Sequence, residues 1–179
     1  MPGKDVDLVV IGAGLSGCAL VAALRRRDWQ GTIQILEAGR GAGGRCATRR
    51  RRDDPLWRLD HGSPTLSFHA APRGQLLELM TSLQQRGVVR VDDDPVVGLD
   101  HLGTAVEAPE HPLLQGPRWR GVPNMASVAE ILLSDGAEGV DVGFGERIQS
   151  LSKVDGRWLL TGGVHAAKLV LSGTLLAHP

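Results

Sequence analysis

Apolar runs and glycine-rich turns alternate in the amino-terminal part of the chain, and their order predicts a strand, a helix and a second strand. Residues 8–11 form a short, continuous apolar run rich in β-branched side chains, which is typical of a strand buried on both faces. After a glycine-rich turn, residues 18–27 carry apolar positions at helical spacing and end in arginines, which predicts a helix. Residues 32–36 repeat the buried-strand pattern and lead into Glu37.

Three glycines occupy the turn between the first predicted strand and helix: Gly12, Gly14 and Gly17. In a dinucleotide-binding fold the first allows a tight turn, the second lets a pyrophosphate approach the backbone, and the third lets the helix pack close to the strand. The start of the helix would offer free N–H groups and the positive end of its dipole to the phosphates. The alternative is a tight turn in some other α/β domain, but the flanking strand and helix favour a dinucleotide.

Glu37 ends the second predicted strand, 20 residues after Gly17. An acidic side chain in this place accepts hydrogen bonds from the adenosine ribose in dinucleotide-binding folds. The other interpretation is an ordinary strand-end carboxylate in solvent. The spacing favours the ribose.

Two further helices and a strand are predicted in the middle of the chain. Apolar residues recur at helical spacing over 75–85 and again over 126–133, which indicates amphipathic helices. Residues 88–91 predict a strand, and three aspartates follow it at 92–94. Three carboxylates suggest a cation site, but this segment lacks the glycine and the terminal glutamate of an EF-hand loop. We therefore interpret it as a solvated turn.

The carboxyl-terminal segment predicts a small β-meander that leads back to the first sheet. Apolar and polar positions alternate from Val140, and Asp155-Gly156 is a hairpin turn signal before another strand at 158–161. A buried apolar run over 167–171 follows a second glycine pair. The predicted class is therefore α/β, with a parallel Rossmann-type sheet, helices on both faces and a small β-meander.

Composition and charge exclude several classes of protein. The chain has 179 residues, 42% of them hydrophobic, with 20 Lys+Arg and 20 Asp+Glu, so no global field favours nucleic acid or an anionic membrane. Four Trp, two Phe and no Tyr argue against a stacking surface for single-stranded nucleic acid. Cys18 and Cys46 provide neither a disulfide framework nor a metal-ligand cluster, and no metal is expected. No apolar run approaches the length of a membrane span and the amino terminus has no signal-peptide layout, so a cytoplasmic protein is expected.

A second glycine-rich loop, residues 38–49, follows the second predicted strand directly. Gly43 and Gly44 allow another close approach of the backbone to a ligand. Arg45 can present its planar guanidinium to phosphate oxygens, and Thr48 could add a hydroxyl. Glycine content alone would favour a flexible surface connection.

The run from Val10 to Arg49 resembles the amino-terminal signature of FAD-dependent oxidoreductases of the amine-oxidase type. In that group the G-x-G-x-x-G turn and the strand-end Glu are followed by G-G-R and a Ser or Thr. More narrowly, residues 43–50 (GGRCATRR) are similar to the G-G-R-x-A-T-R-R motif of the renalase branch. Residues 59–63 (LDHGS) and 121–125 (GVPNM) resemble the D-H-G-A and G-x-P-x-M segments of that branch.

The resemblance implies FAD as the cofactor. The glycine turn, Glu37 and Arg45 would hold its ADP half, the backbone around Ile148 would contact the adenine, and the backbone of His61 and Gly62 would lie against the flavin. A satisfied loop histidine is an equal alternative for His61. The predicted cofactor-binding residues are Gly12, Ala13, Gly14, Leu15, Ser16, Gly17, Glu37, Ala38, Gly44, Arg45, His61, Gly62 and Ile148. No catalytic residue is predicted, since flavin chemistry belongs to the cofactor.

The resemblance also implies a division into domains. Residues 1–63 and 126–179 would form a cofactor-binding domain, and residues 64–125 would be the inserted start of a substrate domain. Family members are about twice as long and finish with a segment that closes over the flavin. No counterpart of that segment is recognised here, so the chain is expected to be the amino-terminal portion of such a protein.

Arg49 to Arg52 form a basic run followed by two aspartates. A nucleic-acid interface is one interpretation of such a run, but no aromatic residues are interleaved with it and the net charge of the chain is zero. We interpret the run as a solvated loop neutralised by its own aspartates. The alternative is that Arg49 or Arg50 adds positive potential near the cofactor.

The sequence thus predicts an FAD-dependent oxidoreductase that oxidises a small organic substrate by hydride transfer to the flavin, with oxygen as the re-oxidant. The renalase resemblance implies a reduced nicotinamide dinucleotide as substrate, and the wider family implies an amine. Two alternatives stay open: an NAD(P)-binding Rossmann module, and a truncated flavin-binding remnant without catalysis. No nucleic-acid or membrane partner is expected, and the sequence defines no oligomeric state.

Overall fold

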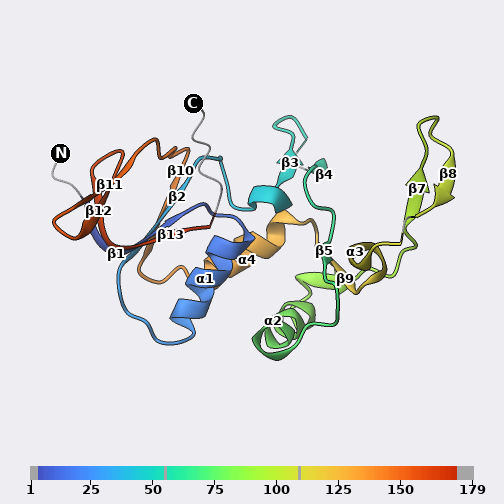
Figure 1. Cartoon of the computed structure of the whole chain (residues 1–179), viewed down its shortest axis with the longest axis horizontal. Helices are drawn as coiled ribbons and strands as arrows, with labels where there is room; N and C mark the ends of the chain where they lie inside the picture. Colours follow the sequence, from blue (N-terminus) through green and yellow to red (C-terminus); the bar gives the residue numbers. More distant parts are fainter. Residues whose placement is uncertain (1–3, 55, 109, 173–179) are drawn as a thin grey trace. The chain divides into compact units, whose positions relative to one another are not determined.

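The computed structural model describes residues 4–54, 56–108 and 110–172, and the chain divides into two compact units (Figure 1). The first unit is Met1–Ala47 with Ala129–Pro179, and the second is Thr48–Val128. The elements of the first unit are β1 (Lys4–Ile11), α1 (Leu15–Arg25), β2 (Ile33–Glu37), the 3₁₀ turn η1 (Gly44–Cys46), β10 (Val140–Phe144), β11 (Leu151–Val154), β12 (Arg157–Leu160) and β13 (Val164–Leu171). Helix α4 (Ala126–Asp135) continues the chain from the second unit into the first.

A six-stranded sheet forms the centre of the first unit, in the order β10-β2-β1-β13-β12-β11. β10, β2, β1 and β13 are parallel, and β12 and β11 are antiparallel to their neighbours. Asp155 and Gly156 join β11 to β12 with φ values of 49° and 79°, as a two-residue hairpin turn requires. β13 then returns to pair with β1 from Lys4↔Val164 to Ile11↔Leu171. The predicted α/β class and the meander are confirmed.

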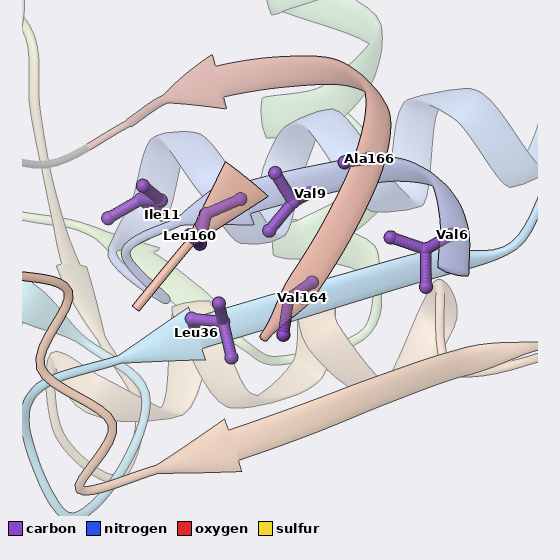
Figure 2. Packing of buried hydrophobic residues seen from close by; sticks show 7 residues of the cluster. All are labelled: Val6, Val9, Ile11, Leu36, Leu160, Val164 and Ala166. Atoms are coloured by element: carbon purple, nitrogen blue, oxygen red, sulfur yellow. The ribbon is translucent and has the colours of Figure 1, made fainter. Parts of the chain in front are cut away.

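Helices and strands close the core of the first unit on different sides. α1 and α4 lie side by side, because a Cβ on Gly136, just after α4, would lie 2.8 Å from Cγ1 of Val21. A cluster of buried apolar side chains lies on the strands of the sheet (Figure 2). Its members are Val6, Val9, Ile11, Leu36, Leu160, Val164 and Ala166. Among the described residues, the side chains packed against this cluster come from β11, β12, β13 and the segment before the meander, not from a helix. The meander thus takes the place of the helix cover expected there.

Short strands and two helices make up the second unit. Its elements are β3 (Thr48–Arg50), β4 (Arg58–Asp60), β5 (Leu66–Ser67), α2 (Gly74–Gln85), β6 (Val89–Val91), β7 (Val97–Leu99), β8 (Ala105–Glu107), α3 (Pro112–Gln115) and β9 (Arg118–Gly121). β5, β9 and β6 form an antiparallel sheet, whereas β3–β4 and β7–β8 are separate two-stranded hairpins. Met80 and Leu83 bury the apolar side of α2 and Val89 is buried in β6, so the helix at 75–85 and the strand at 88–91 are confirmed.

The acidic segment after β6 is not wholly solvated. Asp92 exposes only 4% of its side chain, and its carboxylate pairs with Nη2 of Arg120 at 3.2 Å and with Nε of Arg118 at 3.8 Å. The Asp92 N–H also donates to the Arg118 carbonyl at 3.0 Å, which continues the pairing of β6 with β9. Asp93 and Asp94 are exposed, as predicted. The solvated-turn interpretation is therefore wrong for Asp92, because strand pairing brings two arginines to it.

Candidate functional site

The carboxyl ends of the parallel strands meet at one edge of the first unit, which is the edge where ligands bind in open α/β sheets. Gly12 follows β1, Glu37 ends β2, and Ser172 follows β13. The segment after β10 runs beside the end of β2, since the Glu146 N–H donates to the Glu37 carbonyl at 2.9 Å. Residues far apart in the chain are therefore neighbours at this edge.

The two glycine-rich loops lie against each other. The Gly43 N–H donates to the Ala13 carbonyl at 2.9 Å, and Gly14 and Gly43 form an isolated parallel bridge. A Cβ on Gly44 would lie 3.1 Å from Cα of Gly14, and a Cβ on Gly14 would lie 3.9 Å from Cα of Gly44. Any side chain at either position would occupy the space between the loops, so glycine keeps both backbones accessible there.

Gly17 has a different role, which is to let α1 approach the end of β1. A Cβ at this position would lie 2.2 Å from the Gly12 carbonyl oxygen and 2.6 Å from Oγ of Ser172. No side chain fits in that space. This is the close helix–strand contact that the third glycine of the motif serves.

Ser172 and Glu37 hold the peptide between Gly12 and Ala13 from opposite sides. The Ser172 hydroxyl donates to the Gly12 carbonyl oxygen at 2.6 Å, and the Ala13 N–H donates to Oε2 of Glu37 at 2.7 Å. The C=O and N–H of a trans peptide point in opposite directions, so these two contacts fix the orientation of the glycine turn. The sequence analysis missed Ser172. The available signal was a polar residue directly after the apolar strand that returns to β1.

We expect Ser172→Ala to lower the free energy of unfolding by about 1–2 kcal/mol, because it leaves the Gly12 carbonyl without its hydroxyl donor. Urea unfolding followed by circular dichroism would measure the change. Ser152→Ala, on an exposed position of β11, is the matched control and should change stability by less than about 0.5 kcal/mol. Equal effects of the two substitutions would show that the Ser172 hydroxyl does not hold the turn.

Both oxygens of Glu37 are engaged by the loops around it. Oε2 accepts from Ala13 at 2.7 Å and Oε1 accepts from the Gly39 N–H at 2.6 Å. Each carboxylate oxygen can accept a second hydrogen bond, and the side chain is only half-buried. The carboxylate therefore lies beside the glycine turn with acceptor capacity left for a sugar hydroxyl.

The start of α1 offers hydrogen-bond donors at the same place. The first helical bond runs from the Cys18 N–H to the Gly14 carbonyl at 3.0 Å, so the N–H groups of Leu15, Ser16 and Gly17 precede it and have no acceptor within the helix. η1 contacts α1 and carries Arg45, whose side chain is exposed. This set of donors, dipole and guanidinium suits an anion such as a diphosphate.

Cys18 lies directly beneath this turn as a core residue. Its side chain is fully buried, and its Sγ donates to the Ala13 carbonyl at 3.4 Å. Burial raises the pKa of the Cys18 thiol to about 11, with a further contribution from the negative charge of Glu37. The thiol therefore stays protonated at neutral pH and serves packing rather than chemistry.

The remaining predicted residues are divided between the units. Ala38 is exposed after β2, and the side chain of Ile148 packs against the apolar cluster of the sheet. His61 and Gly62 are exposed and belong to the second unit. The carboxylate of Asp60, next to His61, accepts a hydrogen bond from Oγ1 of Thr48 at 2.5 Å.

The described residues offer neither a metal site nor a membrane-spanning helix. No group of three or more His, Cys, Asp or Glu side chains in that part of the chain is placed to hold a metal ion. Within residues 4–54, 56–108 and 110–172, no helix combines the length and the apolarity that a membrane crossing demands.

Comparison with known proteins agrees with this geometry. Residues 10–83 match the model of a family described as an NAD(P)-binding Rossmann-like domain. No curated protein matches the sequence.

Solved structures share the fold. Putrescine oxidase bound to putrescine superposes with a TM-score of 0.61 at 13% identity, covering 95% of this chain and 58% of that one. A putative protoporphyrinogen oxidase from Exiguobacterium sp. 255-15 gives 0.62 at 16% identity, covering 96% and 59%. A Rab GDI from Plasmodium falciparum gives 0.59 at 9% identity, covering 94% and 65%.

The chain therefore has a Rossmann-like dinucleotide-binding fold of the kind found in oxidases such as putrescine oxidase, as the resemblance to the amine-oxidase group implied. It spans less than two thirds of the length of each of these structures. The matches do not single out the renalase branch, which stays a prediction. The presence of a Rab GDI among them shows that the fold is not confined to proteins named as oxidases.

Proposed function

We propose that this dinucleotide-binding fold takes FAD at its two glycine loops and forms the cofactor-holding part of an oxidoreductase. The observation that carries the proposal is the approach of Gly14 to Gly44, with the Glu37 carboxylate bonded to the same turn. A diphosphate has to come close to backbone N–H groups, and the sugar beside it needs an acceptor. The residues present fit both demands.

Each predicted residue has a place in this proposal. The turn from Gly12 to Gly17, with the N–H groups of Leu15 and Ser16, would bind the diphosphate, and Arg45 would add positive charge. Glu37 and the adjoining Ala38 backbone would take the ribose, and the backbone around Ile148 would contact the adenine. His61 and Gly62 would lie against the flavin ring. Bound there, FAD would supply the chemistry of hydride acceptance from the substrate and electron transfer to oxygen.

We propose an amine or a reduced nicotinamide dinucleotide as the substrate of the whole protein. The amine is supported by the likeness of fold to putrescine oxidase, and the dinucleotide by the renalase-like motif at 43–50. Residues 1–63 and 126–179 would form the cofactor domain and residues 64–125 the start of the substrate domain. A cytoplasmic location would suit both kinds of substrate.

Two observations favour other functions and set the measurements that distinguish them. The matched family is described as NAD(P)-binding, so FAD and NADH affinities should be measured side by side; tighter binding of NADH would replace our proposal. The fold is shared with a protein that is not named as an oxidase, a Rab GDI, so a flavin-binding remnant without catalysis is the other candidate. FAD binding at one molecule per chain, without substrate-dependent oxygen consumption, would favour that remnant.

Gly14→Ala tests the binding site without disturbing the fold. Gly14 has φ of −73° and ψ of 179°, which alanine adopts freely, and the new methyl would meet only Cα of Gly44 at 3.9 Å. We expect stability to fall by no more than about 1 kcal/mol, the scale of a changed helix cap. FAD affinity should fall by about 10–100-fold, because the methyl occupies the space of the diphosphate and costs charge-assisted hydrogen bonds of about 1.5–3 kcal/mol.

Titration calorimetry or quenching of flavin fluorescence would measure this affinity. The control must be a glycine that alanine can replace without strain. Gly145, which follows β10, does not qualify, because its φ of 78° is left-handed. Gly41 lies in the second loop without a left-handed φ, and a methyl added there would have nothing within 4 Å. Gly41→Ala should therefore bind FAD like the unchanged protein. If Gly14→Ala also retains full affinity, the cofactor does not lie between the loops.

A further inference from the structure

The β3–β4 hairpin carries exposed apolar and basic side chains on the same short segment. We call the described residues 49–54 and 56–59 the hairpin tip. All five of its arginines are exposed: Arg49, Arg50, Arg51, Arg52 and Arg58. Leu56 is 90% exposed, Leu59 50% and Trp57 38%. A solvated loop explains exposed arginines but not large apolar side chains exposed beside them. Exposed apolar side chains with polar neighbours are typical of an interaction site.

The base of the hairpin is fixed to the start of α4. The Thr48 hydroxyl donates to Oδ1 of Asp60 at 2.5 Å and accepts from the Ala126 N–H at 3.1 Å. Asp60 in turn accepts from the Met125 N–H at 3.1 Å. Because the two strands are tied together at this end, Leu56 and Trp57 at the other end are presented to solvent by an ordered support.

The aspartates of the tip are occupied by the tip itself. Asp54 accepts from the N–H groups of Leu56 at 3.0 Å and Trp57 at 3.2 Å, which sets the turn that displays both side chains. Asp53 pairs with Arg51. Five arginines against these two aspartates leave the tip with a net charge of +3, in a chain whose net charge is zero.

We propose that the hairpin tip docks on the surface of an anionic phospholipid bilayer. An exposed Trp sits at the level of the headgroups, a neighbouring Leu enters the edge of the acyl region, and arginines are drawn to anionic lipid. The zero net charge of the whole chain predicted no membrane contact, but the structure gathers positive charge around apolar side chains in one place. A nucleic acid fits less well, because Leu56 and Leu59 would have no role on a phosphate backbone.

The β7–β8 hairpin of the same unit is a natural control. It exposes apolar side chains to a similar degree, with Leu99 at 70% and Leu102 at 77%. Its charged neighbours are acidic, however: Asp100 precedes Leu102, and Glu107 lies opposite Val97. An anionic surface would repel this hairpin. Substitutions in it therefore test whether exposed apolar side chains bind the membrane when no positive charge lies beside them.

The test is co-sedimentation of the protein with vesicles of phosphatidylcholine alone, and with vesicles in which about a third of the lipid is phosphatidylserine, the anionic lipid that basic segments recognise. We expect binding to the anionic vesicles only, weakened by added salt. Arg52→Gln should lower the partition coefficient about fivefold, and Leu56→Ser about tenfold or more. Leu102→Ser should leave binding unchanged. Trp57→Phe should remove the blue shift of tryptophan emission on binding while the protein still sediments.

Several results would overturn the proposal. Absence of binding to anionic vesicles would do so, as would equal binding to neutral ones. If Leu102→Ser weakens binding as much as Leu56→Ser, exposed apolar area in general is responsible and not the hairpin tip. Preference for a single-stranded oligonucleotide over anionic vesicles at equal salt would assign the basic tip to nucleic acid.

Discussion

Gly17→Ala is expected to destabilise the first unit by about 3 kcal/mol, the upper end of the usual cost of overpacking. The added Cβ would lie 2.2 Å from the Gly12 carbonyl oxygen, a backbone atom, and 2.6 Å from Oγ of Ser172. Relief requires α1 to move away from β1, or the Gly12 peptide to move away from α1. The first movement loosens the packing of the helix on the sheet, and the second breaks the hydrogen bond from Ser172 that orients the glycine turn. Chemical unfolding followed by circular dichroism would measure the loss.

Gly41→Ala is the matched control, since a methyl there meets nothing within 4 Å. Its stability should stay within about 0.5 kcal/mol of the unchanged protein. Gly14→Ala should also fold, yet lose cofactor affinity. Three glycines from neighbouring glycine-rich segments are therefore expected to give three outcomes: loss of stability, loss of binding, and no loss. Equal stability of Gly17→Ala and Gly41→Ala would contradict the close packing of α1 on β1.

The parts of the fold that could be predicted are those with local signals. β1 shows as a continuous apolar run because parallel neighbours and cover on both faces exclude polar side chains from its centre. The hairpin between β11 and β12 shows through Asp155-Gly156, which can adopt the left-handed conformations of a tight turn. The glycines at Gly12, Gly14 and Gly17 mark the turn itself. In each case the cause lies within a few residues of the effect.

The parts that could not be predicted depend on partners far away in the chain. Ser172 bonds to the Gly12 carbonyl across 160 positions, and a single polar residue after an apolar run does not specify that contact. β3, β4, β7 and β8 have three residues each, too few for a period of two to be recognised. Arg49 and Arg50 pair with Leu59 and Arg58 of β4, and so short a pairing leaves no pattern that distinguishes it from the loop predicted for residues 49–52.

The candidate site divides in the same way. Gly14 and Glu37 were identified by spacing, since a fixed geometry of strand, turn and strand end is all that the motif needs. That the Gly44 loop touches Gly14 is a tertiary fact, and so is the second hydrogen bond of Glu37 to Gly39. The sequence therefore predicts the residues whose role follows from the motif around them, such as Gly14 and Glu37. It does not predict the contacts that hold one loop against another.

Asp92→Asn is expected to destabilise the second unit by about 3–5 kcal/mol, the usual cost of removing one partner from a buried ion pair. The substitution keeps the shape of the side chain and removes its charge. It leaves Arg118, whose side chain is 11% exposed, and Arg120, whose side chain is 40% exposed, facing a neutral amide. The Arg118 guanidinium also bonds to the Leu114 carbonyl at 2.6 Å, so it cannot turn to solvent without further loss.

Trp119 lies between the two arginines on β9. With the other three tryptophans replaced by Phe in both proteins, its emission should report the unfolding of this unit at a lower denaturant concentration in Asp92→Asn. Asp93→Asn is the matched control. The Asp93 carboxylate is next to Asp92 in the chain but is exposed, so its loss should change the free energy of unfolding by less than about 0.5 kcal/mol. Coincident unfolding curves for the two variants would show that the pair adds nothing. FAD affinity should be retained in Asp92→Asn under conditions where both units are folded, because Asp92 is not among the predicted cofactor-binding residues and the residues that hold the Gly12–Ala13 peptide lie in the first unit.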